Sequence, residues 1–376
     1  MMKPSILPGQ TIGILGGGQL GRMMGLSARA MGYRIAVLEP KPDAPTAQIA
    51  DVSVEAAYDD RSAAEELAGH CDVLTYEFEN IDADTASFLE QSMYLPQGGS
   101  LLHTTKHRGR EKQAIQDGGV DVSPYRLVSS AAALEEAMQD IGCPAVLKTC
   151  EGGYDGKGQV VIRDDTNIQD AFNELAAQTT DLVLEAWIPF EKEISVIVTR
   201  STNGETTTFP AGENRHRNNI LHQTIVPADI AEQTEQKAVS MAYELAEAFD
   251  LVGTLAVEMF VLDEDTVYVN EVAPRPHNSG HYTIEACETS QFEQHVRAVC
   301  GLPLGSTQLL KPVVMTNILG EHVSYVQDHF ASFAGGGHVH FYGKQEAKPG
   351  RKMGHWTVLG SGRDDALEKT SRVWPE

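Results

Sequence analysis

Cysteine and positive charge are both scarce in this 376-residue sequence. The five cysteines are scattered and form no CxxC pair with metal-site spacing, so we expect them to be reduced and mostly buried. Lysine and arginine total 29 against 53 aspartates and glutamates, which gives a formal net charge of -24. Because this charge repels nucleic acid and anionic membranes, we expect neither as a partner, and any anionic ligand must meet a local basic cluster.

Long apolar runs are also missing. Charge or glycine interrupts every apolar segment well before membrane-spanning length, and the N-terminus lacks the pattern of a basic region, an apolar stretch and a cleavage site. Hydrophobic residues still make up 41% of the chain, enough for a large core, and the length suggests two or three domains. We therefore expect a globular, cytoplasmic protein.

Residues 1–110 have the pattern of a Rossmann-like α/β domain. Apolar runs at 11–15, 34–38 and 72–76 predict parallel strands, with a helix after the first that ends near Met31. The sequence YEFEN, which includes Glu77, follows the third run. Ligands collect at the carboxyl ends of such strands, so we expect a binding site at this edge.

A glycine turn, GGGQLG at residues 16–21, lies between the first strand and its helix. It fits G-x-G-x-x-G, and Glu39 ends the next strand where a dinucleotide site has a ribose-binding acid, so an NAD-dependent oxidoreductase is one interpretation. Such turns also serve other polar ligands, because they expose N–H groups at the positive end of a helix. The turn alone therefore does not decide the function.

Residues 111–188 predict a compact α+β unit. Lys148 ends a strand and is followed by the glycine loop EGGYDGKG at 151–158, which leads directly into another strand. This is not a P-loop, which requires a helix after the loop. Four glycines exceed the need of a plain hairpin turn, so we predict a flap whose amides cover nucleotide phosphates while Lys148 supplies positive charge. The other predicted elements are a helix at 131–141, strands at 145–149, 159–162 and 182–187, and a helix at 168–177.

Residues 189–376 predict a mixed α+β domain that contains a pair of facing acids. If Leu262 pairs with Val267 across the turn DEDT, then Glu258 faces Glu271. Like charges opposite each other are destabilising unless a cation lies between them, and oxygen ligands beside ATP phosphates favour Mg²⁺. Asn270 would join this site only if the strand bulges. Strands at 194–199 and 206–212, a helix at 234–248 and the hairpin at 254–273 complete the prediction; the alternative for the acids is a solvated hairpin.

Lys344, Arg351 and Lys352 form a basic cluster in an otherwise acidic chain. Binding of a substrate phosphate would explain it, and a solvated charged loop is the alternative. The neighbouring histidines at 338, 340 and 355 lack a metal-site spacing, so we expect no zinc site there.

Together these segments resemble the ATP-grasp superfamily and, within it, the 5-(carboxyamino)imidazole ribonucleotide synthase family of purine biosynthesis. The resemblance is carried, in order, by GILGGGQLGRM, TYEFEN, EGGYDGKG, FEKEIS, NEVAPRPHNSGHYT and GRKMGH. It implies an ATP-grasp fold with an N-terminal pre-ATP-grasp domain, a central lid and a C-terminal mixed domain. It also implies a ligase that uses ATP and Mg²⁺ to carboxylate 5-aminoimidazole ribonucleotide with bicarbonate through carboxyphosphate, a homodimer, and transient hand-off of the product to the following mutase.

The resemblance further implies roles for individual residues. Nucleotide binding falls to Arg108, Lys148, Gly153, Tyr154, Asp155, Gly156, Lys157, Gly158, Glu185, Ala186, Trp187, Ile188, Glu193, His216, Asn270 and Glu271, and the metal to Glu258 and Glu271. Binding of the ribonucleotide falls to Gln19, Leu20, Glu77, Tyr154, Asp155, Arg275, His277, Asn278, Lys344, Arg351 and Lys352. Catalysis falls to Lys148, Tyr154, Asp155 and Arg275, with Asp155 orienting the substrate amine or accepting its proton.

Other functions remain open at this point. Another ATP-grasp enzyme, such as a glycinamide ribonucleotide transformylase or a biotin carboxylase, would share the nucleotide site and use a different acceptor. An oxidoreductase would leave the second glycine loop unexplained. An inactive nucleotide-binding regulator is disfavoured by the intact Lys148, Glu258 and Glu271.

Overall fold

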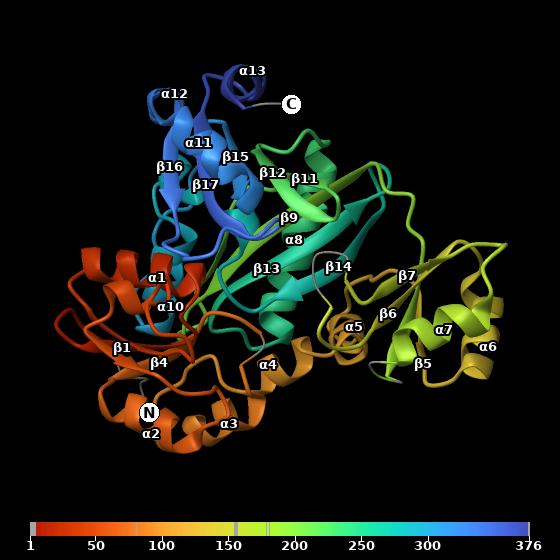
Figure 1. Ribbon diagram of the computed structural model, residues 1–376, viewed down its shortest axis with the longest axis horizontal. Coiled ribbons are helices and arrows are strands. Elements are labelled where there is room, and N and C mark those ends of the chain that lie inside the picture. Colours follow the sequence, from red (N-terminus) through yellow and green to blue (C-terminus); the bar gives the residue numbers. More distant parts are fainter. Residues whose placement is uncertain (1–4, 80, 154–156, 178, 180, 375–376) are drawn as a thin grey trace.

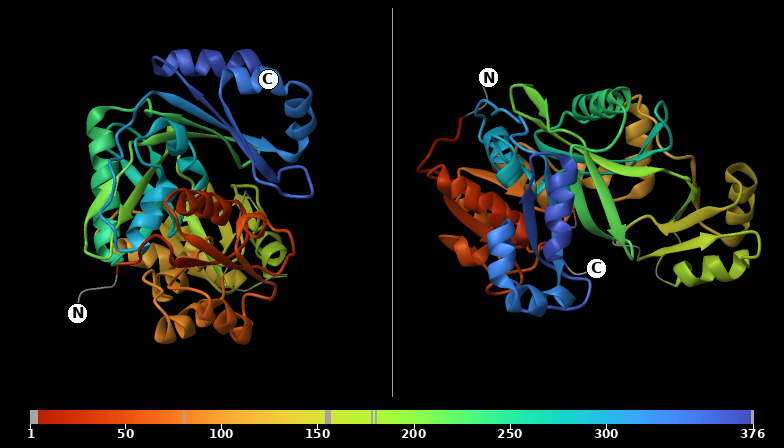
Figure 2. Two further views of the ribbon diagram at one scale, coloured as in Figure 1. Left: turned by 90° about the vertical axis from the view of Figure 1, so that its left-hand side faces the viewer. Right: turned by 90° about the horizontal axis from the view of Figure 1, so that it is seen from above.

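The computed structural model describes residues 5–79, 81–153, 157–177, 179 and 181–374. Its strands form an N-terminal sheet, a large central sheet and a small sheet, which follow one another along the long axis in Figure 1. Seen from above in Figure 2, the small sheet and its helices project away from the rest. Among the described helices, none is both long and apolar enough to cross a bilayer.

The N-terminal sheet is parallel, with the strand order β3-β2-β1-β4. Helices cover both faces, which explains why the strands are almost continuously apolar. One face packs against α1 and, from much later in the chain, α10 (Gln291–Val299). The elements are β1 (Thr11–Leu15), α1 (Gln19–Ala30), β2 (Arg34–Leu38), η1 (Ala47–Ile49), β3 (Val52–Val54), α2 (Arg61–Gly69), β4 (Val73–Tyr76), α3 (Ala83–Ser92) and α4 (Ser100–Thr105).

The small sheet is antiparallel, in the order β5-β8-β6-β7, and α6 and α7 pack together on one of its faces. Side chains along β6 alternate, so that Leu147 enters this core while Val146 and Lys148 turn to the opposite face. Ser130 and Asn167 cap the two helices with their side chains. The elements are β5 (Tyr125–Val128), α6 (Ala131–Ile141), β6 (Ala145–Thr149), β7 (Gln159–Ile162), α7 (Ile168–Ala176) and β8 (Leu182–Ala186).

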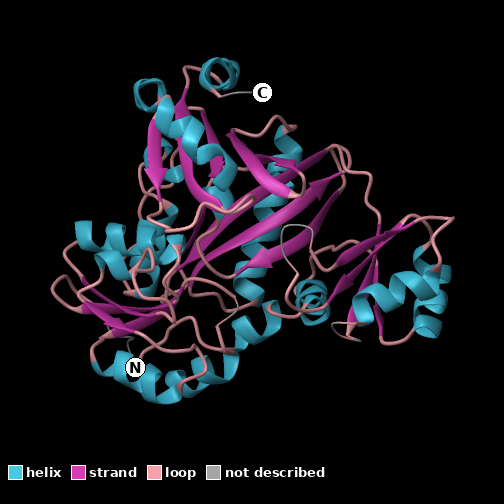
Figure 3. Ribbon diagram, in the orientation of Figure 1, coloured by secondary structure: helices cyan, strands magenta, loops and turns pink. Residues whose placement is uncertain are grey.

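The central sheet has the order β14-β13-β9-β11-β12-β15-β17-β16, with β10 paired to β9. Figure 3 shows helices along its outer surfaces, where α8 packs on β9 and β13, and α13 on β15. The strands are β9 (Lys192–Arg200), β10 (Thr206–Thr208), β11 (Gly212–Arg217), β12 (Ile220–Val226), β13 (Gly253–Val261), β14 (Val267–Ala273), β15 (Val313–Leu319), β16 (His338–Phe341) and β17 (Lys352–Leu359). The other helices are α5 (Arg108–Asp117), α8 (Glu232–Ala248), η2 (Asn278–Gly280), α9 (Thr283–Ala286), η3 (Gly320–His322), α11 (Val323–Asp328), α12 (Phe330–Gly336) and α13 (Arg363–Val373).

The predicted α/β and α+β fold class is confirmed, and most predicted elements are present within a few residues of their expected ends. One predicted strand is wrong: we expected residues 206–212 to form a continuous strand, but β10 ends at Thr208 and β11 begins at Gly212. Pro210 lies between them and cannot donate to a strand ladder. The predicted boundary after residue 110 falls inside α5, and the division into three domains stays a prediction.

Candidate active site

The larger of two adjoining cavities lies between the small sheet and the β13–β14 hairpin. Its volume is about 770 Å³, and Val146 and Lys148 face it from β6. Residues that the sequence assigns to the nucleotide come together in its lining: Arg108, Lys148, Gly153, Lys157, Glu185, Ala186, Trp187, Ile188, Glu193, His216, Asn270 and Glu271. Gly158 is not part of this lining. Tyr154, Asp155 and Gly156 lie outside the described residues.

Two lysines hold the Glu185 carboxylate in this cavity. Lys148 Nζ lies 2.9 Å from Glu185 Oε2, and the buried Lys112 Nζ lies 3.4 Å from the same oxygen. Burial raises the pKa of Glu185, but Lys112, Lys148 and Arg108 outweigh it and lower the pKa to about 2. Its second oxygen, Oε1, is buried with no hydrogen-bond partner among the described residues. A fixed anion therefore faces the cavity with one acceptor left for a ligand.

Glu258 and Glu271 face each other across β13 and β14, as predicted. The register that brings them together differs from the predicted one. Val261, not Leu262, pairs with Val267, which shifts the pairing by one residue. A bulge that leaves Asn270 unpaired shifts it back, so that Glu258 faces Glu271. The bulge also places Asn270 in the lining, with its Oδ1 buried and unpartnered within the described chain.

The charges around the two acids are asymmetric. Arg108 Nη1 lies 3.0 Å from Glu271 Oε2, and although burial raises the pKa of Glu271, this guanidinium lowers it below its usual value. Burial and the neighbouring Glu271 raise the pKa of Glu258 to about 7. Two close carboxylates and an unpartnered amide oxygen are hard oxygen ligands, so this set fits Mg²⁺.

Glu193 and His216 form a pair at another part of the lining. His216 Nδ1 lies 2.5 Å from Glu193 Oε2; burial lowers the pKa of His216, but this carboxylate raises it above its usual value. Elsewhere in the lining, the amides of Ala186 and Trp187 already donate to the carbonyls of Pro124 and Pro144. Contacts from these two residues to a base would therefore use their carbonyls or side chains.

The described ends of the glycine loop need glycine for two reasons. Gly152 and Gly158 have φ of +77° and +71°, which other residues rarely adopt. A methyl group on Gly153 would lie 2.9 Å from the carbonyl oxygen of Lys157. Arg108 reaches the same turn, with Nη2 3.5 Å from the carbonyl oxygen of Gly153.

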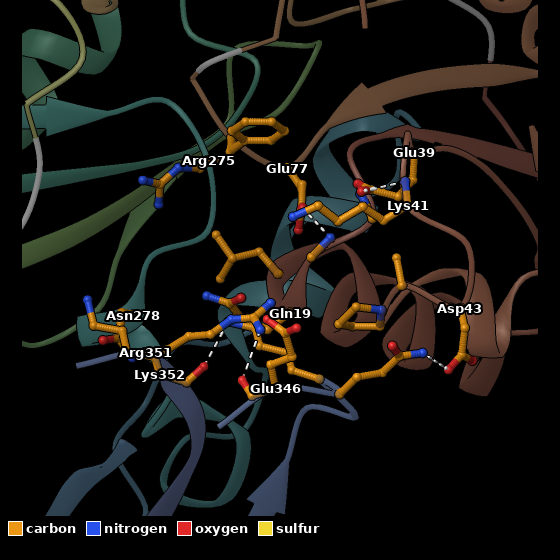
Figure 4. A pocket seen from close by; sticks show the side chains of 18 of the residues that line it. Gln19, Glu39, Lys41, Asp43, Glu77, Arg275, Asn278, Glu346, Arg351 and Lys352 are labelled. Atoms are coloured by element: carbon orange, nitrogen blue, oxygen red, sulfur yellow. Dashed lines mark hydrogen bonds between the residues drawn. The ribbon is translucent and has the colours of Figure 1, made fainter. Parts of the chain in front are cut away.

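The second cavity, of about 700 Å³, lies between the start of α1 and the loop that joins β16 to β17. Figure 4 shows Arg351, Lys352 and Glu346 on one side, Glu39, Lys41 and Glu77 on another, and Gln19 between them. The described residues predicted for the ribonucleotide all line it: Gln19, Leu20, Glu77, Arg275, His277, Asn278, Lys344, Arg351 and Lys352.

Basic side chains gather at the loop side of this cavity. Lys344 Nζ donates to the carbonyl oxygen of Lys352 at 2.7 Å, and Arg351 donates to that of Glu346 at 2.9 Å. Burial and the adjacent Arg351 lower the pKa of Lys344 to about 8. In a chain of net charge -24, this concentration of cations makes the loop side of the cavity locally positive.

The two cavities meet at Arg275, His277 and Lys352, which line both. Glu79 Oε2 lies 2.5 Å from Arg275 Nε and fixes the guanidinium. Burial and the charge of Arg275 keep the pKa of His277 well below its usual value. Since His277 Nδ1 accepts from the Ser279 amide, its proton is on Nε2, which points to Glu258 Oε1 at 3.4 Å. Neutral His277 and charged Arg275 therefore lie at the boundary that the two cavities share.

The first glycine turn does not have a free set of amides for a dinucleotide. Glu77 accepts from the amides of Gly18 and, at 2.6 Å, Gly21, and Glu39 accepts from that of Gly17 at 2.8 Å. Carboxylates of the protein thus occupy the positive end of α1 where a pyrophosphate would lie. This geometry argues against the oxidoreductase, because a bound pyrophosphate would have to displace two buried acids.

Several residues of the site escaped the sequence analysis: Lys41, Tyr58, Glu79, Glu111 and Lys112. The sequence contained one weak indication for Glu111 and Lys112. Helix α5 has the very polar sequence RGREKQAIQD, so if this helix packs against the rest of the protein, its inner face must bury charged side chains. Glu79 stands in the YEFEN segment, but nothing local shows that it meets Arg275.

Three successive parts of the chain match known protein-family models. Residues 9–102 match the ribonucleotide synthetase preATP-grasp domain, 113–292 the ATP-grasp domain, and 313–369 the phosphoribosylaminoimidazole carboxylase C-terminal domain. The N5-carboxyaminoimidazole ribonucleotide synthase of Bacillus subtilis (strain 168) is 51% identical over 374 residues, covering 100% of this chain and 98% of its own. The chain belongs to the N5-carboxyaminoimidazole ribonucleotide synthase family.

Solved structures of this family agree closely with the fold. The ADP complex of one synthetase superposes with a TM-score of 0.95 at 55% identity, over 99% of this chain and 98% of that chain. The Aspergillus clavatus enzyme in complex with ADP and 5-aminoimidazole ribonucleotide superposes with a TM-score of 0.89 at 31% identity, over 97% of each chain. The family resemblance inferred from the sequence motifs is thereby confirmed, and with it the ATP-grasp fold.

Proposed function

We propose that this chain carboxylates 5-aminoimidazole ribonucleotide with bicarbonate at the expense of ATP, giving N5-carboxyaminoimidazole ribonucleotide, ADP and phosphate. The observation that carries the proposal is the junction of two cavities of different chemistry. The larger cavity has paired acids and basic residues beside a glycine loop, as a metal-bound triphosphate requires. The smaller cavity has basic side chains gathered at its loop side, which suit the phosphate of a substrate. Membership of the synthase family supports the choice of substrate.

In the larger cavity, Arg108, Lys148 and the amides around Gly153 hold the triphosphate, with Lys157 and Gly158 in the same loop. Glu185 and the following hinge residues bind the adenine, and Glu193 with His216 binds the ribose. Glu258, Asn270 and Glu271 would hold Mg²⁺, which would neutralise phosphate charge. Since phosphoryl transfer depends on positioning and electrostatics, no covalent nucleophile is needed.

Carboxylation then takes place where the cavities meet. A bicarbonate oxygen takes the γ-phosphoryl group, ADP leaves, and the carboxyphosphate so formed has phosphate as its leaving group in place of hydroxide. Arg275, fixed by Glu79, stabilises the negative charge beside the reacting carbon. The substrate amine attacks the carbon of carboxyphosphate and displaces phosphate, or it attacks CO₂ after carboxyphosphate has released CO₂ and phosphate. In both routes the amine proton passes to a base, for which Asp155 is the candidate.

In the smaller cavity, Lys344, Arg351 and Lys352 bind the substrate phosphate, while Gln19, Leu20, Glu77 and Asn278 shape the walls around the rest of the ribonucleotide. Because N-carboxylated amines lose CO₂ in water, transient hand-off of the product to the following mutase would limit its loss. By family resemblance we further infer a homodimer that works in the cytoplasm, where ATP is available.

An assay of ADP release tests the substrate assignment. We expect ADP to form at one equivalent per carboxylated product, and only when Mg²⁺, bicarbonate and 5-aminoimidazole ribonucleotide are all present. Glycinamide ribonucleotide should give no stimulation, because it lacks the imidazole that the second cavity would enclose. Stimulation by glycinamide ribonucleotide instead would assign the chain to another ATP-grasp reaction.

A further inference from the structure

A second group of potential metal ligands lies away from the two cavities, under the β16–β17 hairpin. It consists of Glu285 on α9, His340 on β16 and His355 on β17, here called the His–Glu cluster. His340 and His355 are direct cross-strand partners, and the ligand atoms of all three side chains lie within 4.8 Å of one another. The cluster is therefore assembled by the sheet and α9 together, which explains why sequence spacing did not reveal it.

The cluster contains buried polar atoms whose bonding capacity is unmet. His355 is fully buried, and its Nε2 has no hydrogen-bond partner among the described residues. Glu285 Oε2 and His281 Nε2 are also buried atoms without a hydrogen-bond partner among the described residues. The ring centroid of His281 lies 4.9 Å from that of His355. A buried polar atom left unpaired is destabilising. Several such atoms side by side indicate a missing common partner.

The surroundings prepare His355 to act as a ligand. Tyr342 is buried, and its hydroxyl lies 2.9 Å from His355 Nδ1. Metal-binding histidines commonly have the second ring nitrogen fixed in this way. When Nδ1–H donates to the Tyr342 hydroxyl, the lone pair of His355 lies on Nε2, where a cation can accept it.

We propose that Glu285, His340 and His355 bind a divalent transition-metal ion of the zinc class. Two imidazoles and one carboxylate are a donor set that suits Zn²⁺, whereas Mg²⁺ prefers oxygen ligands throughout. One ion would complete the bonding of both His355 Nε2 and Glu285 Oε2. The His340 side chain is 33% exposed and provides a route of entry.

Binding requires a small rearrangement. Metal–ligand bonds of about 2 Å place ligand atoms about 3.3 Å apart in a tetrahedral site, so the three side chains must draw together. His340 now lies 2.5 Å from Glu285 Oε1 and stacks on His355 with 15° between the ring planes, so one ring must turn. The ion would then join α9 to the hairpin whose loop carries Lys344 and Arg351.

Metal retention by the full-length protein tests the proposal. Chelator-treated protein would be dialysed against Zn²⁺ in excess Mg²⁺, which keeps the Glu258–Glu271 site from retaining zinc, and its metal content measured. We expect one tightly held zinc per chain in the wild type and its loss in His340→Gln. The matched control is His338→Gln on the same strand, where the side chain is exposed and outside the cluster, and which should retain the zinc.

Cobalt substitution identifies the ligands even if a variant folds poorly. Co²⁺ bound by the His–Glu cluster in the wild type should show visible bands of nitrogen and oxygen ligation, without a thiolate charge-transfer band. A thiolate band would place the ion at His107, Cys150 and Asp181 instead and overturn the proposal. No retained zinc in the wild type would also overturn it, leaving ordered water as the partner of the buried atoms. Retention unchanged in a folded His340→Gln would do the same.

Discussion

At the scale of single residues, the decisive arrangement is that of Glu258 and Glu271, two acids that face each other across β13 and β14 with one guanidinium beside them. Arg108 Nη1 lies 3.0 Å from Glu271, whereas the pKa of Glu258 is raised to about 7 by burial and by Glu271. Glu271 is therefore ionised at neutral pH, whereas Glu258 shares its site with a neighbouring charge, and a bound cation would lower the pKa of Glu258.

Replacement of Glu271 by Gln keeps the shape of the side chain and removes its charge. We expect kcat/KM for ADP formation to fall roughly 10²-fold or more, the usual loss when one group that stabilises a transition state is removed. Glu264→Gln is the control, because Glu264 lies in the exposed turn of the same hairpin. Activity of Glu271→Gln within threefold of wild type, at saturating Mg²⁺, would contradict the metal assignment.

Glu111 is an acid that the fold tolerates at a cost in stability. Burial and the nearby Glu271 raise its pKa to about 8. The unfolded pKa is about 4.3, so between about pH 4.3 and pH 8 Glu111 is protonated in the folded state and ionised in the unfolded state. The contribution of Glu111 to stability therefore falls as pH rises through this range and levels off above about pH 8.

Glu111→Gln should therefore stabilise the protein, and more so at pH 9 than at pH 6. The amide keeps an oxygen for the Val272 N–H, which Glu111 Oε1 accepts at 2.8 Å. We expect a gain in unfolding free energy of at least about 1 kcal/mol at pH 9, since one pKa unit corresponds to about 1.4 kcal/mol. Urea unfolding at both pH values measures it, with Asp117→Asn on the same helix as control; an equal or larger gain at pH 6 would be inconsistent with this explanation.

At the scale of elements, the first glycine turn shows how a familiar pattern can serve a different purpose. Its amides bind Glu39 and Glu77 and so hold the start of α1 against the strand ends. The same turn presents Gln19 and Leu20 to the second cavity.

Gly18→Ala tests this arrangement. A methyl group there would lie 2.5 Å from Glu77 Oε1, so the carboxylate and the start of α1 must move apart. We expect the KM for the ribonucleotide to rise severalfold while the KM for ATP, which we assign to the other cavity, changes little. Gly69→Ala on α2 meets nothing within 4 Å and should leave both values unchanged. A selective rise in the KM for ATP would show that the turn belongs to the nucleotide site.

Sequence reasoning gave most elements because their apolar periodicity and caps are local properties. It found the facing acids by assuming a regular hairpin, although the facing position depends on the bulge at Asn270. It could not find Glu79 beside Arg275, because that contact joins segments far apart in the chain. The assigned roles of the site residues stay predictions, including those of Tyr154 and Asp155, which lie outside the described residues.

At the scale of the whole molecule, three sheets bring distant segments to one reaction centre. The small sheet and the β13–β14 hairpin enclose the larger cavity, proposed for the nucleotide, and the N-terminal sheet and the late β16–β17 loop enclose the smaller one, proposed for the ribonucleotide. The two adjoin at Arg275, His277 and Lys352. Such a layout suits an unstable intermediate, because it would react within a few ångströms of where it forms.

Transfer of oxygen from bicarbonate to phosphate tests this account most directly. With bicarbonate labelled with ¹⁸O, Mg-ATP and 5-aminoimidazole ribonucleotide, attack by bicarbonate on ATP at the junction predicts one labelled oxygen in each phosphate released. Phosphate without label would mean that water or another group accepts the phosphoryl group, and would contradict the proposed coupling of the two cavities.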